Sequence, residues 1–152
     1  MSKLQVIRLS KEFRFEAAHA LWNYDGLCRN IHGHSYILRV TIKGTPVNDT
    51  ANPKNGMVMD FSALKKIVKE VIVEPFDHAF MVNDSMPESM FSDAGQMFGR
   101  IMRLPYQPTC ENMIVDFAAR IRTRLPNNII LHSLRLYETS NSFAEWLAED
   151  NL

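Results

Sequence analysis

Residues 32–43 read His-Gly-His-Ser-Tyr-Ile-Leu-Arg-Val-Thr-Ile-Lys, the clearest structural signal in the chain. Apolar and polar residues alternate here with the period of a half-buried strand. The predicted buried face carries His32, His34, Tyr36, Leu38, Val40 and Ile42, and the opposite face carries Ser35, Arg39, Thr41 and Lys43. Two imidazoles therefore begin the buried side of this strand.

Similar alternations flank this stretch on both sides. Upstream, one face of a predicted strand carries Phe13, Phe15, Ala17 and His19. Downstream, a strand over residues 129–139 has a predicted face of Ile130, His132, Leu134, Leu136 and Glu138. Residues 43–56 are dense in turn-forming types, and Met57-Val58-Met59 follows as a short strand closing a hairpin with a long loop.

Two helices complete the predicted architecture. Asp60 is a good N-cap for a helix that stops at Pro75, and Thr109 caps a second helix that ends at Pro126. Between them, Ser85–Tyr106 shows no clear pattern, although Met90, Ala94, Met97, Phe98 and Ile101 have the spacing of a short amphipathic helix. The order of elements predicts an α+β fold, with an antiparallel four-stranded sheet and two helices packed on one face.

Composition sets the class of protein. With 152 residues and 46% hydrophobic side chains, the chain is expected to form a single domain over residues 1–152. Equal numbers of basic and acidic residues give no net charge, which argues against a nucleic-acid partner. Two cysteines are expected to be free thiols, and the sequence shows neither a signal peptide nor a membrane span. A cytoplasmic protein without a membrane partner is therefore expected.

The pattern His32-Gly33-His34 carries the first chemical signal. Residues i and i+2 of a strand point to the same side, so two imidazoles can hold one metal ion. Half-exposed histidines at the start of a strand are the simpler interpretation of this pattern alone. An antiparallel pairing would add His19 from the neighbouring strand, and three imidazoles leave a fourth position on zinc open for catalysis.

Other candidate residues have a structural and a chemical interpretation. Cys28 is either a small buried residue or a thiolate beside a cation that transfers protons. Asp77 and His78 follow a helix, where the carboxylate can orient the imidazole. Glu138 is either a solvated strand end or a carboxylate that binds an amidine-like edge through paired hydrogen bonds.

Six motifs, in order along nearly the whole chain, match one family. They are Phe15-Glu16-Ala17-Ala18-His19, Cys28-Arg29-Asn30-Ile31-His32-Gly33-His34, Gly56-Met57-Val58-Met59-Asp60-Phe61, Phe76-Asp77-His78, Pro108-Thr109-Cys110-Glu111-Asn112 and Glu138-Thr139. The sequence resembles the 6-pyruvoyl-tetrahydropterin synthase and 6-carboxytetrahydropterin synthase family. Three residues separate Cys28 from His32, and this spacing resembles that of the bacterial 6-carboxytetrahydropterin synthases.

The resemblance implies a role for each site residue. His19, His32 and His34 are expected to hold Zn²⁺, and Cys28 to abstract a proton from the substrate. Asp77 and His78 are expected to form a proton relay on the opposite side of the substrate. Glu138 is expected to anchor the amino-pyrimidine edge and to act with the catalytic relay, and Thr109 to add a pterin contact.

The resemblance also implies an activity and an assembly. The expected reaction is loss of acetaldehyde and triphosphate from 7,8-dihydroneopterin triphosphate, giving 6-carboxy-5,6,7,8-tetrahydropterin for queuosine precursor biosynthesis. Triphosphate elimination by a 6-pyruvoyl-tetrahydropterin synthase is the alternative reaction, and a non-enzymatic pterin or purine binder is the alternative class. The implied tunnelling fold joins sheets into an oligomeric barrel, as a homohexamer of two trimers with active sites between subunits.

Overall fold

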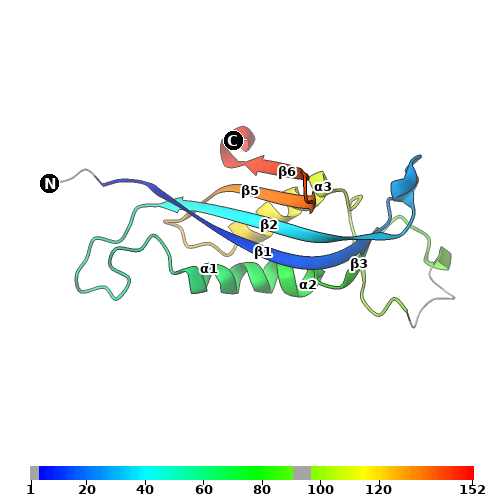
Figure 1. Cartoon of the computed structure of the whole chain (residues 1–152). Helices are drawn as coiled ribbons and strands as arrows, with labels where there is room; N and C mark the ends of the chain where they lie inside the picture. The colour runs from blue at the N-terminus through cyan, green and yellow to red at the C-terminus, as the bar shows by residue number, and fades with distance from the viewer. Residues whose placement is uncertain (1–3, 91–96) are drawn as a thin grey trace.

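The computed structural model describes residues 4–90 and 97–152, and its strands form one mixed sheet (Figure 1). The strands are β1 (Ile7–His19), β2 (His32–Gly44), β3 (Ala79–Asn83), β4 (Ile101–Leu104), β5 (Ile130–Thr139) and β6 (Ser142–Leu147). Their order across the sheet is β4-β3-β1-β2-β5-β6. The β1–β2, β2–β5 and β5–β6 pairs are antiparallel, whereas β1–β3 and β3–β4 are parallel.

The predicted α+β class is confirmed, but the prediction of four antiparallel strands is wrong. The described residues form six strands, of which β3 pairs in parallel with β1 and β4 in parallel with β3. Residues Met57–Met59 form no strand. The backbone N–H of Val47 donates to the carbonyl of Met57, and Gly56 donates back to Val47, so this segment closes a loop instead of joining the sheet.

The long hairpin β1–β2 forms as the alternation predicted. Its register pairs Ile7 with Gly44 at one end and His19 with His32 at the other. Because Ala17 pairs with His34, the buried faces of both strands coincide. The hairpin thus carries three histidines to one end of the sheet, on the same face as the core.

A register shift in β5 corrects one predicted face. The pairing with β2 slips between Thr41 and Ile42, so Leu131 is buried and Ile130 is exposed. The extra residue of a β-bulge reverses the alternation on one side of it. Beyond the bulge, Leu134 and Leu136 are buried as predicted.

The first helical segment is continuous but changes its winding. It runs through α1 (Phe61–Val68), a π-helical stretch (Lys69–Val73) and α2 (Glu74–Phe76), and the Asp60 carboxylate accepts from the Ser62 N–H as an N-cap. Pro75 lies inside the last turn, so the predicted stop is early by one residue. Because proline has no N–H, the carbonyl of Val71 needs another donor, and the Arg120 guanidinium reaches it at 3.4 Å.

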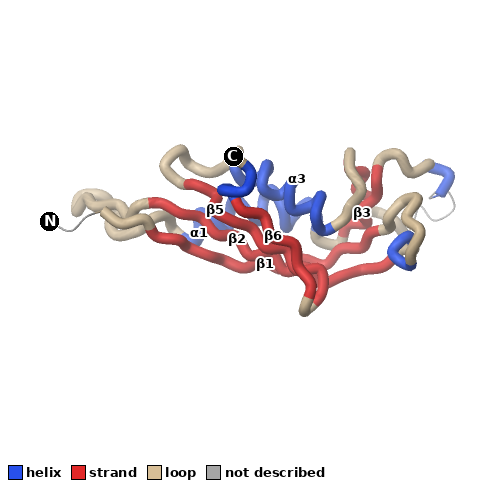
Figure 2. Tube along the Cα trace, turned by 90° about the horizontal axis from the view of Figure 1, so that it is seen from above, coloured by secondary structure: helices blue, strands red, loops and turns tan. Residues whose placement is uncertain are grey.

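The second predicted helix, α3 (Cys110–Arg122), starts as expected, with Thr109 Oγ1 accepting from the Asn112 N–H. Both helical segments cover one face of the sheet, as predicted (Figure 2). The core between them includes Phe13, Phe15, Tyr36, Leu38, Val40, Leu64, Val68, Ile72, Phe76, Met113, Phe117 and Ile121. Burial of these apolar side chains is the main stabilising contribution.

One polar contact within this layer gives a stability test. The Tyr106 hydroxyl donates to Asp116 Oδ2, and Arg120 holds the other carboxylate oxygen at 2.9 Å. Tyr106→Phe removes a hydrogen bond to a charged acceptor, so we expect a loss of about 1.5 kcal/mol in the free energy of unfolding. Urea unfolding measures it: the midpoint should fall at unchanged slope. An unchanged midpoint would contradict this contribution.

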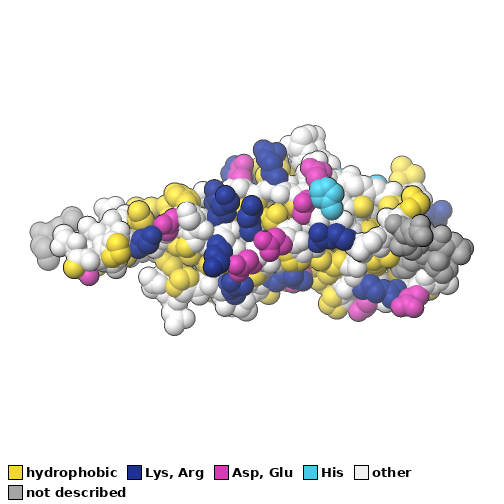
Figure 3. All heavy atoms as spheres, turned by 90° about the horizontal axis from the view of Figure 1, so that it is seen from below, with side chains coloured by type: hydrophobic (Ala, Val, Ile, Leu, Met, Phe, Trp, Pro, Cys, Tyr) yellow, Lys and Arg dark blue, Asp and Glu magenta, His cyan; other side chains and the backbone are white. Residues whose placement is uncertain are grey.

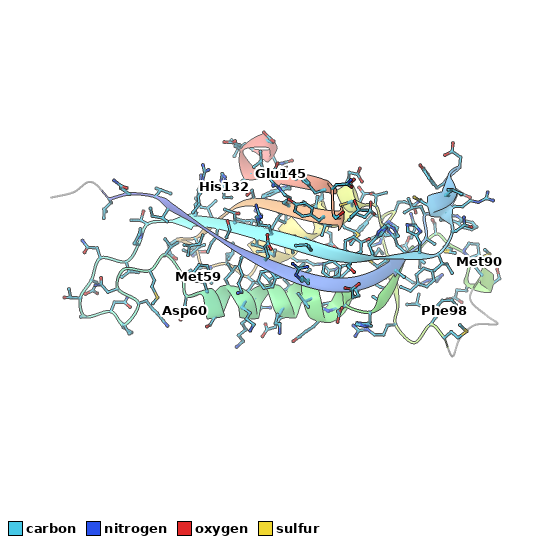
Figure 4. All side chains as sticks on the ribbon, viewed as in Figure 1. Met59, Asp60, Met90, Phe98, His132 and Glu145 are labelled. Carbon is cyan, nitrogen blue, oxygen red and sulfur yellow. The ribbon has the colours of Figure 1, made fainter. Side chains whose placement is uncertain are left out.

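The segment between the two helices is not the predicted amphipathic helix. Residues 91–96, including Ala94, lie outside the described residues, and Ile101 belongs to strand β4. Met90 and Phe98 lie at the end of the molecule where the chain passes from β1 to β2 (Figure 4). There Phe98 packs on Phe80 with ring centroids 5.2 Å apart, so apolar packing holds this segment.

The surface carries both signs of charge. Side chains of Lys and Arg lie among those of Asp and Glu over the middle of the molecule when it is seen from below (Figure 3). Pairs such as Arg39 with Glu12, 2.8 Å apart, contribute to this mixture. Within the described ranges, no helix has the length and apolar character needed to cross a bilayer.

Candidate metal centre and active site

Three imidazoles converge at the end of the β1–β2 hairpin. His19 ends β1, while His32 and His34 begin β2, and their candidate ligand atoms all lie within 4.8 Å of one another. His19 Nε2 and His32 Nε2 are 2.8 Å apart. The structure therefore brings together the three residues that the alternation placed on one face.

Backbone carbonyls fix the orientation of two of these rings. His19 Nδ1 lies 2.7 Å from the carbonyl of Pro108, and His32 Nδ1 lies 2.7 Å from the carbonyl of Asn30. A carbonyl only accepts hydrogen bonds, so Nδ1 carries a proton in both rings and Nε2 is the nitrogen left to face the cluster. This tautomer, held by an outer hydrogen bond, is the one that binds metals.

The cluster fits a cation. Two Nε2 lone pairs that face each other at 2.8 Å repel unless a proton or a metal ion lies between them. His34 Nε2 is buried and, among the described residues, has no hydrogen-bond partner. Burial lowers the pKa of His19 to about 4, which keeps this imidazole in the neutral form that a metal requires.

Glu138 closes the cluster from strand β5. Its Oε1 lies 3.6 Å from both His19 Nε2 and His34 Nε2. The pairing of β5 with β6 slips between Tyr137 and Thr139, so Glu138 occupies an irregular position at the strand end. This carboxylate is partly exposed and can bind a metal-coordinated ligand or the polar edge of a substrate.

A pocket of about 420 Å³ lies beside Glu138 and the start of α3. Cys110 lines it, and its thiol donates to the carbonyl of Leu136 at 3.2 Å. Burial raises the pKa of Cys110 to about 11, which suits the packing role expected for this residue. Thr109 is adjacent, but its hydroxyl accepts from the Asn112 N–H, so its lone pairs are already partly used by the helix cap.

Cys28 lies outside the histidine cluster, exposed on the 3₁₀ turn Leu27–Arg29. This exposure excludes the interpretation of a buried packing residue. The turn is joined to the metal centre through Asn30, whose N–H and side-chain amide both bond to the Leu27 carbonyl and whose own carbonyl orients His32. The thiol is therefore accessible and lies on a segment fixed by a candidate metal ligand.

Asp77 and His78 form a close pair at the turn between α2 and β3. His78 Nδ1 lies 3.0 Å from Asp77 Oδ2, and Asp77 Oδ1 accepts from the Glu16 N–H at 2.9 Å. His78 lines a shallow pocket whose other lining residues include Glu16, His34 and Ser35. Neither residue is among the three histidines whose ligand atoms converge.

The backbone of His78 supports a functional role for this pair. His78 has a φ of +61°, a left-handed conformation that non-glycine residues adopt infrequently. Its N–H donates to the carbonyl of Glu16, which holds the turn in place. Such strained residues concentrate at functional sites.

The sequence did not reveal the residues that support the metal centre. Gln107 grips the backbone of Trp22 twice, accepting from its N–H at 3.2 Å and donating to its carbonyl at 2.7 Å. The next residue, Pro108, orients His19. The motif at Pro108 indicated that this segment matters. The supporting contacts were not predictable, because a backbone carbonyl or a side chain bonded to the backbone follows no residue pattern.

The Asp77 contacts predict a pH dependence of stability. The hydrogen bond from the Glu16 N–H lowers the pKa of Asp77 below its usual value, and the contact with His78 lowers it further. A lowered folded-state pKa stabilises the fold above the unfolded pKa, near 4, and this contribution disappears as the pH falls through the folded pKa. Asp77→Asn, which can still accept from Glu16, should lose less stability between pH 6 and about pH 3 than the parent chain. An equal loss of unfolding free energy in the variant and the parent chain over this pH range would contradict the prediction.

Comparisons with known proteins agree with this architecture. The family model described as 6-pyruvoyl tetrahydropterin synthase matches residues 8–149. The 6-carboxy-5,6,7,8-tetrahydropterin synthase of Haemophilus influenzae is 39% identical over 93% of this chain and 99% of its own length. The protein of the same name from Aquifex aeolicus is 34% identical over 93% of this chain and 98% of its own length.

A solved structure supports the fold. The 6-pyruvoyl tetrahydropterin synthase of Caenorhabditis elegans superposes with a TM-score of 0.68 at 23% identity, covering 97% of this chain and 99% of that one. The chain thus combines a mixed sheet, helices on one face and three converging imidazoles that could hold a metal ion. The chain belongs to the 6-pyruvoyl tetrahydropterin synthase family, which is a family of enzymes.

Proposed function

We propose that the chain converts 7,8-dihydroneopterin triphosphate and water to 6-carboxy-5,6,7,8-tetrahydropterin, acetaldehyde and triphosphate, a reaction of queuosine precursor biosynthesis. The convergence of three Nε2 atoms beside the Glu138 carboxylate is the observation that carries this proposal. Relatives named 6-carboxy-5,6,7,8-tetrahydropterin synthase over nearly their full length support the choice of product.

His19, His32 and His34 would hold zinc. When bound there, zinc would supply Lewis-acid chemistry toward the substrate side chain. The carbonyls of Pro108 and Asn30 keep two of the imidazoles in the ligating tautomer. Glu138 would accept paired hydrogen bonds from the amino-pyrimidine edge, while Thr109 adds a contact from the helix cap.

Protons would move through two separate groups. Cys28, exposed on its turn, would remove a proton from the substrate side chain as a thiolate. Asp77 accepts from His78 Nδ1–H and so leaves Nε2 of that ring available to exchange a proton. Positioned acids and bases of this kind contribute about 10²–10⁴-fold to a rate.

The position of Asp77 and His78 supports the proposed assembly. Neither residue belongs to the histidine cluster of its own chain, and a neighbouring subunit would complete the relay. The sheet ends in strands β4 and β6, whose outer edges are free to pair in the described chain. We propose a homohexamer of two trimers, each subunit a single domain over residues 1–152, with active sites between subunits. Both cysteines are free thiols, which supports a cytoplasmic location.

Product analysis tests the proposed reaction. Purified protein incubated with 7,8-dihydroneopterin triphosphate should yield 6-carboxy-5,6,7,8-tetrahydropterin on chromatography. Accumulation of 6-pyruvoyl-tetrahydropterin would instead support the second candidate, which a 29% identical relative from Pongo abelii, named 6-pyruvoyl tetrahydrobiopterin synthase, favours. Binding of the substrate without either product would contradict both reactions.

A further inference from the structure

A buried hydroxyl lies beside the metal centre without a partner. Tyr36 follows His34 by two residues on β2, shares its buried face and is 0% exposed. Among the described residues, the Tyr36 hydroxyl has no hydrogen-bond partner. Nearly all buried polar groups in proteins are paired, so an unpaired hydroxyl at this position calls for a functional explanation.

The tyrosine ring is held in place. It stacks on Phe15 with ring centroids 4.9 Å apart and planes only 9° apart. It lies nearly perpendicular to the imidazole rings of His34 and His19, with ring centroids 5.6 Å and 6.4 Å apart. The hydroxyl therefore has a fixed position beside the imidazole cluster and cannot swing to another partner.

Strand pairing places a carboxylate beside this tyrosine. Ile37 pairs with Tyr137 and Leu38 with Leu136, so the next position in the β2–β5 register sets Tyr36 beside Glu138. A tyrosine hydroxyl keeps its proton at neutral pH and can donate. Cys110 already donates to the carbonyl of Leu136. The carboxylate of Glu138 is the acceptor that remains, since each of its oxygens has two lone pairs.

Accessibility determines how the hydroxyl can act. Its oxygen is buried from solvent, so a ligand in the pocket does not touch it. Glu138 is partly exposed and lines that pocket. Glu138 therefore lies where it can contact a ligand on one side and the tyrosine on the other.

We propose that Tyr36 is a positioning residue, whose hydroxyl donates a hydrogen bond to the Glu138 carboxylate when that carboxylate holds the ring of a bound pterin. The inference rests on the proposed function for the role of Glu138. Paired recognition of an amidine-like edge needs both carboxylate oxygens in the plane of the ligand. A donor fixed by ring packing can hold one carboxylate oxygen in that plane once the ligand is bound.

Tyr36→Phe tests this because it keeps the ring and removes only the oxygen. We expect an equal or higher Tm, since an unpaired buried hydroxyl is lost, and unchanged zinc per chain. The affinity for 7,8-dihydroneopterin, a probe without the triphosphate, should fall about tenfold, and KM for the triphosphate should rise by a similar factor.

Tyr106→Phe is the matched control. Its hydroxyl is paired with Asp116, so this variant should show a lower Tm and an unchanged affinity for 7,8-dihydroneopterin. A lower Tm for Tyr36→Phe, or an unchanged affinity and KM, would overturn the proposal. If the parent chain binds 7,8-dihydroneopterin but does not convert the triphosphate, the proposed reaction fails while the binding comparison still decides the role of Tyr36. Failure of the parent chain to bind this probe would overturn both.

Discussion

His34→Ala is expected to remove nearly all bound zinc and, with it, turnover. His34 supplies one of three imidazoles, and its buried Nε2 has no hydrogen-bond partner among the described residues. Loss of an outer hydrogen bond to a metal ligand costs about 10–100-fold in metal affinity, so loss of the ligand itself should cost more than about 100-fold. Metal analysis after gel filtration and a turnover assay on the same sample measure both effects.

His132→Ala is the matched control for this experiment. His132 lies on β5, partly buried, with Arg8 and Lys43 as charged neighbours, away from the cluster. This variant should retain full zinc and full turnover. The proposed site is wrong if His34→Ala keeps its zinc or if His132→Ala loses it, provided that circular dichroism shows both variants folded.

Cys28→Ala is expected to keep its full zinc content while its turnover falls about 10²–10⁴-fold, the usual contribution of a positioned base. The thiol is exposed and does not belong to the histidine cluster, so its removal leaves the candidate metal ligands and the core intact. Zinc content and kcat, measured together on one preparation, check this expectation. A non-enzymatic pterin binder would be indifferent to the change.

Leu27→Ala controls for disturbance of the turn that carries Cys28. Leu27 is the preceding residue and is 87% exposed, so its truncation removes little packing. Full turnover in this variant, with loss in Cys28→Ala, assigns the effect to the thiol. Equal loss in both variants, or undiminished turnover without the thiol, would contradict proton transfer by Cys28.

Strands with strong alternation were predictable, and short apolar strands were not. The β1–β2 hairpin followed from residues 13–19 and 32–43, where one face is clearly apolar. By contrast, Ala79–Asn83 has four buried residues in a row, so it lacks the period of a half-buried strand. Its parallel pairing with β1 depends on the path of the intervening helix, which residue periodicity does not contain.

The site was predictable as far as strand pairing determines it. Antiparallel pairing of His19 with His32 brings the histidines together. The alternation of apolar and polar residues predicted that they lie on the buried face of each strand. The separation of Asp77 and His78 from this cluster depends on the turn after α2, where His78 adopts a left-handed conformation. The unpaired hydroxyl of Tyr36 was also hidden, because a tyrosine on a buried face usually signals packing.

Simultaneous measurement of acetaldehyde and triphosphate tests the proposed reaction most directly. Protein with about one zinc per chain, the content expected for a three-histidine site, is incubated with 7,8-dihydroneopterin triphosphate with and without a chelator. The proposed reaction predicts acetaldehyde and triphosphate in equal amounts, both lost after chelation and restored by added zinc. Triphosphate release without acetaldehyde, or fully zinc-loaded protein that releases neither, would contradict it.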